Sequence, residues 1–402
     1  MWGMQQEIAK IFESYLTKKS TIFRLKEALS PKFLPDKILH RDEQINALAH
    51  ILAPSLKREK PSNVFVYGKS GTGKTLVILH VCRELEKFSG ENSVKVLYVN
   101  CKMRKVADTE YRLIAFLCRA LGKPVPATGL PTYEIYKEFF DLLDKEGKIF
   151  ILVLDEIDRL VKKSGDEVLY NLTRINSELQ NSSVSIVGIS NDVTFKLKLD
   201  PRIRSSLGEE EIIFPPYDAF QLKDILSERA KLAFFEDKVN EGVIEKCAAY
   251  AAREHGDARR ALELLRLAGE IAERMGSPMV MEEHVDLANE KMERETLIEV
   301  VKKQTLHAKL IIHCLINEMY RNQRIYSGDL YDIYCKVCRQ LSIRPLTQRR
   351  VSDFLNEFDI LGIISNKTIS RGRYGRTREI VLTIPEDLAR EVEKMLKAEF
   401  GI

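Results

Sequence analysis

Residues 68–75, with the sequence GKSGTGKT, have the composition and spacing that bind nucleotide phosphates. They match the pattern G-x-x-x-x-G-K-[ST] and stand between the apolar run VFVY and the helical pattern KTLVILHV. Glycines let backbone N–H groups converge on phosphate oxygens, and a helix N-terminus adds partial positive charge. The alternative is a chance turn, which the flanking patterns disfavour. The candidate phosphate-binding residues are Gly68, Lys69, Ser70, Gly71, Thr72, Gly73, Lys74 and Thr75.

Within this loop, we expect Lys74 to reach the β- and γ-phosphates of ATP and Thr75 to hold Mg²⁺. The stretch ILVLDEID places Asp155 and Glu156 directly after an apolar strand pattern. The carboxyl ends of strands are where open α/β sheets bind ligands. Asp155 would therefore assist in binding Mg²⁺, and Glu156 would polarise the attacking water as general base. The alternative is a solvated acidic turn.

A third polar group follows another apolar strand pattern, SIVGISND, which brings Asn191 to a strand end. A short amide beside the γ-phosphate can orient water and sense the loss of that phosphate. Asparagine at a strand end is also a common turn residue. The pattern alone leaves both interpretations open.

The elements that must position these residues alternate between strand and helix patterns. The strand patterns are apolar throughout, as in a parallel sheet covered on both faces. We therefore predict the fold class α/β, with a doubly wound parallel sheet. The strand patterns cover residues 62–68, 94–101, 148–158 and 184–192, and the helix patterns cover 74–88, 133–147 and 167–179.

The chain beyond Pro215 and Pro216 changes its pattern twice. Helical periodicity continues to about residue 296, which predicts a small helical lid domain. Further helix patterns near 305–321, 326–341 and 347–360 precede a glycine-containing hairpin pattern, which together predict a winged-helix domain. The expected domains are residues 1–216, 217–296 and 297–402.

Charge is distributed unevenly along the 402 residues. The net charge is +4, but the part from residue 301 onward carries +6, from 18 Lys and Arg against 12 Asp and Glu. A basic last quarter points to nucleic acid.

The seven scattered cysteines argue against a disulfide framework. No apolar run long enough to span a membrane and no signal-peptide pattern occurs, so we expect a cytosolic protein without a membrane partner.

Two parts of the predicted winged helix could contact DNA. Thr347 is a candidate N-cap, and the residues after it would face base edges in the major groove. The hairpin tip SRGRYGRTR is rich in arginine, which suits phosphate or minor-groove contact, although a solvated charged loop is the alternative. The candidates are Gln348, Arg349, Arg350 and Ser352 in the helix and Arg371, Arg373, Tyr374, Arg376 and Arg378 in the hairpin.

The chain resembles the AAA+ ATPases in four features taken together. These are the phosphate loop, the strand that ends in Asp155 and Glu156, the polar strand end at Asn191 and the helical lid. The segment HGDARRALELLRLA is similar to the second sensor motif of that family, and the resemblance implies that Arg259 reaches the γ-phosphate. The segment LDPRIRSSLGEEE resembles the arginine-finger region. It implies that Arg202 or Arg204 contacts ATP on a neighbouring subunit, unless these arginines are surface charge.

A narrower resemblance covers roughly residues 15–395. The chain is similar to the archaeal origin-recognition/cell-division-control initiators in three parts: the segment FLPDKILHRDEQINALAHIL, the segment GDARRAL and the C-terminal winged helix. The resemblance implies an adenine pocket walled by the stretch containing Pro35, Leu39, His40 and Arg41. It also implies an inserted DNA-contacting helix near CRALGKPVPATGLPTYEIY, for which Lys123 and Thr132 are candidates.

The function implied by this resemblance is that of an ATPase switch, slow in hydrolysis, that binds ATP or ADP with Mg²⁺. Its expected partners are double-stranded origin DNA, the replicative MCM helicase and a paralogous initiator subunit, and it would act on the nucleoid in the cytoplasm. Two alternatives remain. One is a regulatory, signalling-type ATPase whose winged helix is a packing element, and the other is a clamp-loader subunit.

Overall fold

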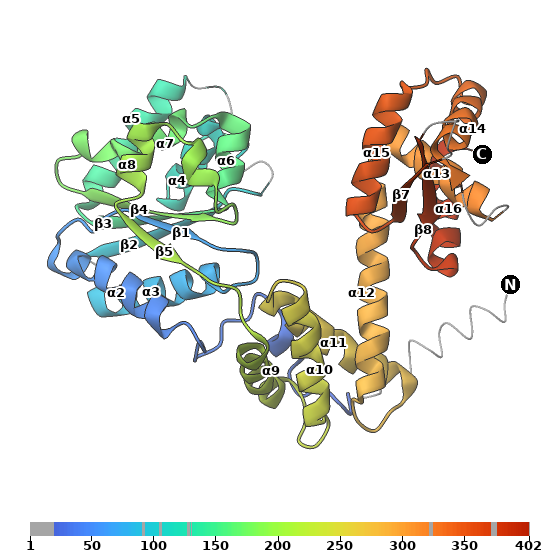
Figure 1. Cartoon of the computed structure of the whole chain (residues 1–402). Coiled ribbons are helices and arrows are strands. Elements are labelled where there is room, and N and C mark those ends of the chain that lie inside the picture. Colours follow the sequence, from blue (N-terminus) through green and yellow to red (C-terminus); the bar gives the residue numbers. More distant parts are fainter. Residues whose placement is uncertain are drawn as a thin grey trace, which may run out of the picture. The chain divides into compact units, whose positions relative to one another are not determined.

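The computed structural model describes residues 20–90, 93–103, 107–126, 129, 131–320, 325–370 and 376–401 (Figure 1). The chain divides into two compact units, Met1–Ala288 and Asn289–Ile402, and each is described by itself.

The first unit is built around a parallel sheet. Its described strands follow the order β2-β3-β4-β1-β5, and every neighbouring pair is parallel. All seven residues of β3 are buried, which explains its uninterrupted apolar sequence. The strands are β1 (Val64–Tyr67), β2 (Val94–Asn100), β3 (Ile149–Asp155), β4 (Ser183–Ser190) and β5 (Glu210–Ile213).

Helices cover both faces of this sheet and form two separate apolar cores. On one face, α2 (Asp42–Leu52) and α3 (Lys74–Ser89) pack against the sheet (Figure 1). The other face is covered by α4 (Glu110–Ala120), α5 (Thr132–Glu146), α6 (Ile157–Ser164), α7 (Glu167–Thr173) and α8 (Pro201–Leu207). The predicted α/β fold with a doubly wound parallel sheet is confirmed. The predicted helix patterns did not include α2, α4, α6 and α8.

A helical lid completes the first unit. It contains α9 (Ala219–Ala233), α10 (Glu241–Arg253), α11 (Ala258–Met275) and the beginning of α12 (Glu282–Lys302). Asp218 and Gln221 form a capping box at the start of α9. Strand β5 ends at Ile213 and α9 begins at Ala219, on either side of the proposed domain boundary at residue 216.

The N-terminal segment, defined here as residues 20–39, is attached to the lid. Arg24 N donates to Ala233 O at 2.8 Å, and Phe235 N donates to Ile22 O at 3.1 Å. The rings of Phe23 and Phe234 stack with their centroids 4.8 Å apart. The segment, which contains the short 3₁₀ helix η1 (Lys26–Leu29), is therefore part of the lid structure although it precedes the sheet in sequence.

The second unit has the predicted winged-helix arrangement. Among its described residues, α13 (Leu306–Met319), β6 (Ile325–Tyr326), α14 (Ser327–Gln340), α15 (Gln348–Ile360), β7 (Ile364–Ser370), β8 (Arg376–Leu382) and α16 (Glu386–Phe400) follow in order. The strands pair antiparallel in the order β6-β8-β7. The three predicted helices and the hairpin are confirmed, whereas α16 was not predicted.

Candidate nucleotide and DNA sites

A small cavity at the carboxyl ends of the strands brings the predicted catalytic residues together. This phosphate cavity has a volume of about 70 Å³. Strand register explains the grouping, because Asn100 of β2 pairs with Asp155 of β3 at the same edge of the sheet. Asn100 was not predicted. The lining residues are Gly71, Thr72, Gly73, Lys74, Thr75, Asn100, Asp155, Glu156, Asn191 and Arg259.

Two positions of the loop require glycine, because their backbone has a positive φ and because neighbouring side chains leave no room for a Cβ. Gly71 and Gly73 have φ of +70° and +91°. A Cβ on Gly71 would lie 1.8 Å from Oδ1 of Asp257, and one on Gly73 would lie 2.7 Å from the hydroxyl oxygen of Tyr217. The glycines therefore allow the beginning of α11 and the residues after β5 to approach the phosphate loop.

Lys74 is buried at the centre of the loop. Its Nζ donates to the carbonyl oxygens of Gly68 and Lys69, each at 2.7 Å. Burial, and then the nearby Arg259 guanidinium, lower the pKa of Lys74 from 10.5 to about 8. A buried ammonium beside a second cation favours an anionic ligand, which is what a triphosphate would supply.

This lowered pKa predicts a pH-dependent affinity. Below pH 8 the ammonium of the free protein is charged and can bind phosphate, whereas above pH 8 it is progressively neutral. We expect the affinity for Mg·ATP to fall by about tenfold between pH 7 and pH 9 if the charged form alone binds. Calorimetry in buffers of different ionisation enthalpy should show proton uptake near pH 8, because bound phosphate raises the pKa of Lys74 again.

The control for this prediction is Lys74→Arg, whose guanidinium stays charged over the whole range. Its affinity, whatever its absolute value, should not change between pH 7 and pH 9. A wild-type profile as flat as that of the variant, without proton uptake, would contradict the assignment.

Asp155 and Thr75 form the candidate Mg²⁺ site. The Thr75 hydroxyl donates to Oδ2 of Asp155 at 3.0 Å, and the Tyr98 hydroxyl donates to the same oxygen at 2.8 Å. Hydroxyl and carboxylate oxygens are hard ligands that fit Mg²⁺, which completes its shell with water and phosphate oxygens. When bound there, the ion would neutralise charge on the phosphates. Tyr98, which was not predicted, fixes the orientation of the Asp155 carboxylate.

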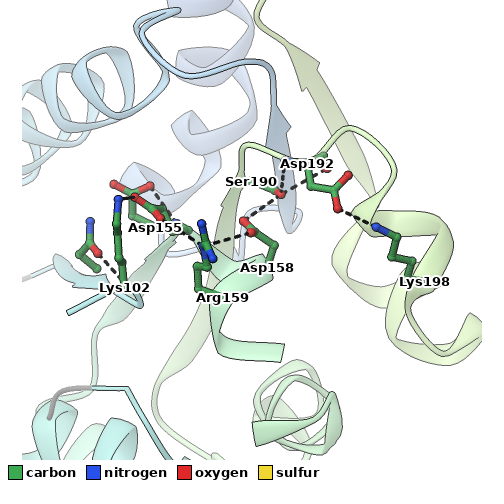
Figure 2. Close-up of polar contacts among 9 residues, drawn as sticks. Lys102, Asp155, Asp158, Arg159, Ser190, Asp192 and Lys198 are labelled. Carbon is green, nitrogen blue, oxygen red and sulfur yellow. Dashed lines mark hydrogen bonds and ion pairs between the residues drawn. The ribbon is translucent and has the colours of Figure 1, made fainter. Parts of the chain in front are cut away.

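Glu156 stands at the turn from β3 to α6 and has a left-handed backbone with φ of +53°. Lys102 Nζ lies 3.6 Å from Oε1 of Glu156, and Arg159 Nε lies 3.9 Å from Oε2. Figure 2 shows Lys102 and Arg159 beside Asp155 at the end of β3. In the same view, the buried Ser190 donates its hydroxyl to Oδ1 of Asp158 at 3.1 Å, just before Asn191.

A larger cavity of about 710 Å³ adjoins the phosphate loop. This nucleoside cavity is enclosed by residues of the N-terminal segment, α3, α9 and α11, and apolar side chains such as Leu76, Ile225 and Leu262 make it suitable for an adenine ring. Pro35 and Leu39, two candidates for the adenine pocket, line it. The lid residues Ile225 and Leu262 were not predicted.

His40 and Arg41, the other adenine-pocket candidates, are not among the residues that line this cavity. His40 Nε2 pairs with Oδ2 of Asp224 at 2.8 Å. Arg41 is only 2% exposed and stacks on Tyr217, with its guanidinium carbon 3.6 Å from the ring centroid. It donates to Thr72 O at 2.9 Å and Pro215 O at 2.7 Å. Arg41 therefore stabilises the phosphate loop by donating to its backbone, and it does not line the nucleoside cavity.

The two arginine-finger candidates belong to α8. Arg202 is exposed and pairs with Asp200, at 3.3 Å between Nε and Oδ1, and Arg204 is half-buried. Neither lines the phosphate cavity of its own chain. This placement neither supports nor contradicts contact with a neighbouring subunit, and the finger stays a prediction. Arg259, in contrast, lines both cavities from the first turn of α11.

The candidate recognition helix is α15. Gln348, Arg349 and Arg350 are exposed in its first turn, whereas Ser352 is half-buried. Thr347 occupies the N-cap position, as predicted, but its side chain forms no capping hydrogen bond.

The hairpin candidates are only partly described. Arg378 donates to Oδ1 of Asn356 at 2.7 Å and so connects β8 to α15. Arg371, Arg373, Tyr374 and the side chain of Arg376 lie outside the described residues. In the first unit, both candidates of the inserted region are exposed: Lys123 pairs with Glu138, and Thr132 begins α5.

The sheet, phosphate loop, lid and winged helix define a chain of the AAA+ class. Residues 37–187 match the AAA ATPase domain, 223–290 the Cdc6 AAA+ ATPase-type lid domain and 299–392 the CDC6 C-terminal winged helix domain. The chain belongs to the family of ORC1-type DNA replication proteins, as its relatives show. No helix within the described ranges is long and apolar enough to cross a membrane.

Two of these relatives are ORC1-type DNA replication proteins of archaea. That of Thermococcus onnurineus is 52% identical over 385 residues, covering 93% of this chain and 91% of its own. That of Methanosarcina mazei, numbered 1, is 49% identical over 392 residues, covering 96% and 94%. Among solved structures, the Aeropyrum pernix ORC1 protein in complex with DNA aligns with a TM-score of 0.78 and 43% identity. This alignment covers 95% of this chain and 98% of that one.

Proposed function

We propose that this protein is an ATP-dependent replication initiator that binds double-stranded origin DNA and recruits the replicative MCM helicase. The observation that carries the proposal is the phosphate cavity, where a phosphate loop, an Asp-Glu pair, a strand-end asparagine and a lid arginine converge. In this proposal the cavity of the first unit binds ATP, and the exposed arginines of α15 in the second unit contribute to DNA binding. The similarity to an ORC1 protein solved with DNA supports the DNA-binding part.

In the proposed mechanism, Lys74 binds the β- and γ-phosphates, and Thr75 and Asp155 hold Mg²⁺. Glu156 orients and deprotonates the attacking water, and the Asn191 amide is the second polar group that orients this water. Arg259 lies at the N-terminus of α11 and also lines the phosphate cavity, so its contact with the γ-phosphate would link lid position to hydrolysis. We propose slow turnover, which suits a switch better than a motor.

The DNA-binding part is tested with α15. The double variant Arg349→Ala/Arg350→Ala removes two exposed cations from the first turn of the candidate recognition helix. We expect binding to an origin duplex to weaken by about tenfold or more. Footprinting and fluorescence anisotropy at fixed salt measure this effect, and the slope of affinity against salt should fall in magnitude if phosphate contacts are lost.

The matched control is Lys394→Ala/Lys397→Ala, which removes the same charge from exposed positions on α16. Its affinity should stay within about twofold of the wild type, since net charge alone acts weakly at physiological salt. Equal losses in both variants would show non-specific electrostatic attraction and contradict an origin-binding role for α15. Protection of unrelated DNA equal to that of origin DNA would contradict origin recognition itself.

A further inference from the structure

The candidate general base is held between two cations. Glu156 has one carboxylate oxygen 3.6 Å from Lys102 Nζ and the other 3.9 Å from Arg159 Nε. The cations come from different elements, Lys102 from the turn after β2 and Arg159 from the first turn of α6. Each oxygen of this carboxylate is therefore directed to a positive charge.

Both cations contact the carboxylate from outside the phosphate cavity. Glu156 lines that cavity, whereas neither Lys102 nor Arg159 is among its lining residues. The turn that presents Lys102 is fixed by Asn100, whose Oδ1 accepts from Lys102 N at 3.0 Å. Arg159 also lies 4.0 Å from Oδ2 of the buried Asp158. Asn100 and Asp158 thus help to keep the two cations beside Glu156.

We propose that Lys102 and Arg159 are positioning residues that restrain Glu156 in an ion-paired orientation and so limit the rate of ATP hydrolysis. A general base must bring one oxygen within about 2.6–3.2 Å of the attacking water. Ion pairs on both oxygens stabilise the orientations in which the carboxylate points toward its cations, so an orientation that reaches the water loses the free energy of these contacts. This inference rests on the proposed ATPase function.

The restraint is weak enough to be reversible. The side chains of Lys102 and Arg159 are 66% and 53% exposed, and exposed ion pairs contribute little and are screened by salt. Glu156 itself is only 16% exposed, so its carboxylate has few other partners in solvent. Hydrolysis should therefore respond to ionic strength in a way that depends on these two cations.

The test measures phosphate release by the full chain at saturating Mg·ATP and low salt. Lys102→Ala and Arg159→Gln should each raise kcat by about two- to fivefold and leave the KM for ATP unchanged. Added salt should raise the kcat of the wild type toward that of Lys102→Ala/Arg159→Gln, whose own kcat should not respond. Lys102→Arg, which keeps a cation, should retain the wild-type rate.

The matched control is Lys198→Ala. Lys198 is 60% exposed, close to Lys102 in exposure, and its Nζ pairs with Oδ2 of Asp192 at 2.8 Å, apart from Lys102 and Arg159 (Figure 2). Its kcat should equal that of the wild type at every salt concentration. An unchanged or lower kcat in Lys102→Ala and Arg159→Gln would overturn the restraint and leave the ATPase function standing. A wild type that binds no ATP or releases no phosphate would overturn the proposed function and this inference with it.

Discussion

Lys74→Ala is expected to lower the affinity for ATP by about 100-fold or more, since a charge-assisted hydrogen bond to phosphate in a buried site contributes about 3 kcal/mol. The loss has a second source. Lys74 Nζ also donates to the carbonyl oxygens of Gly68 and Lys69, which hold the loop around the phosphate cavity. Titration with a fluorescent ATP analogue measures the change, and circular dichroism with DNA binding shows whether the rest of the chain stays folded.

Lys69→Ala is the matched control for this variant. Lys69 belongs to the same loop, but its side chain is exposed, so we expect it to contribute to phosphate binding through its backbone N–H alone. The substitution leaves that N–H in place, together with the backbone carbonyl that accepts from Lys74. We expect its affinity for ATP to stay within about threefold of the wild type. Tight ATP binding by Lys74→Ala, or equal losses in both variants, would refute the assignment of the phosphate site.

Glu156→Gln is expected to reduce kcat by about 10²–10⁴-fold, which is the usual contribution of a general base. The amide has nearly the same shape but cannot accept the proton of the attacking water. Because Glu156 lines the phosphate cavity and not the nucleoside cavity, the dissociation constant for ATP should change little. Phosphate release at saturating Mg·ATP and a separate binding titration distinguish these two effects.

Glu167→Gln provides the comparison, because Glu167 is an exposed acid in the first turn of α7, away from the cavity lining. It should hydrolyse ATP at the wild-type rate. If Glu156→Gln kept most of the activity, another group would have to activate the water, and the role of Glu156 would be wrong.

The strand ends of the site could be predicted because their chemistry follows from local sequence. Asp155 and Asn191 each follow an apolar run, and parallel strands present their carboxyl ends at one edge. Asn100 and Tyr98 were missed because VKVLYVNC resembles an ordinary strand with a polar end. Their role depends on β2 lying beside β3 in the register that pairs Asn100 with Asp155, and sequence patterns do not give strand order.

The surroundings of the nucleoside cavity depend on contacts between distant segments. Arg41 reaches Pro215 O, 174 residues away, and Arg229 of α9 lies 3.1 Å from Ser30 O, 199 residues away. No local pattern predicts such pairings. Helix α16 was missed for a different reason: its buried Leu388, Val392 and Leu396 do follow helical spacing, so the pattern was present but was not assigned.

The N-terminal segment forms one wall of the nucleoside cavity. Lining residues 31–39 come from this segment, which is fastened to α9 through Ala233 and Phe234. Because this wall is joined to the lid, we expect the two to open together when a base leaves the cavity. We expect ADP to dissociate on the timescale of that opening. The residence time of bound ADP, more than the rate of ATP hydrolysis, would then set how long the protein stays in its post-hydrolysis state.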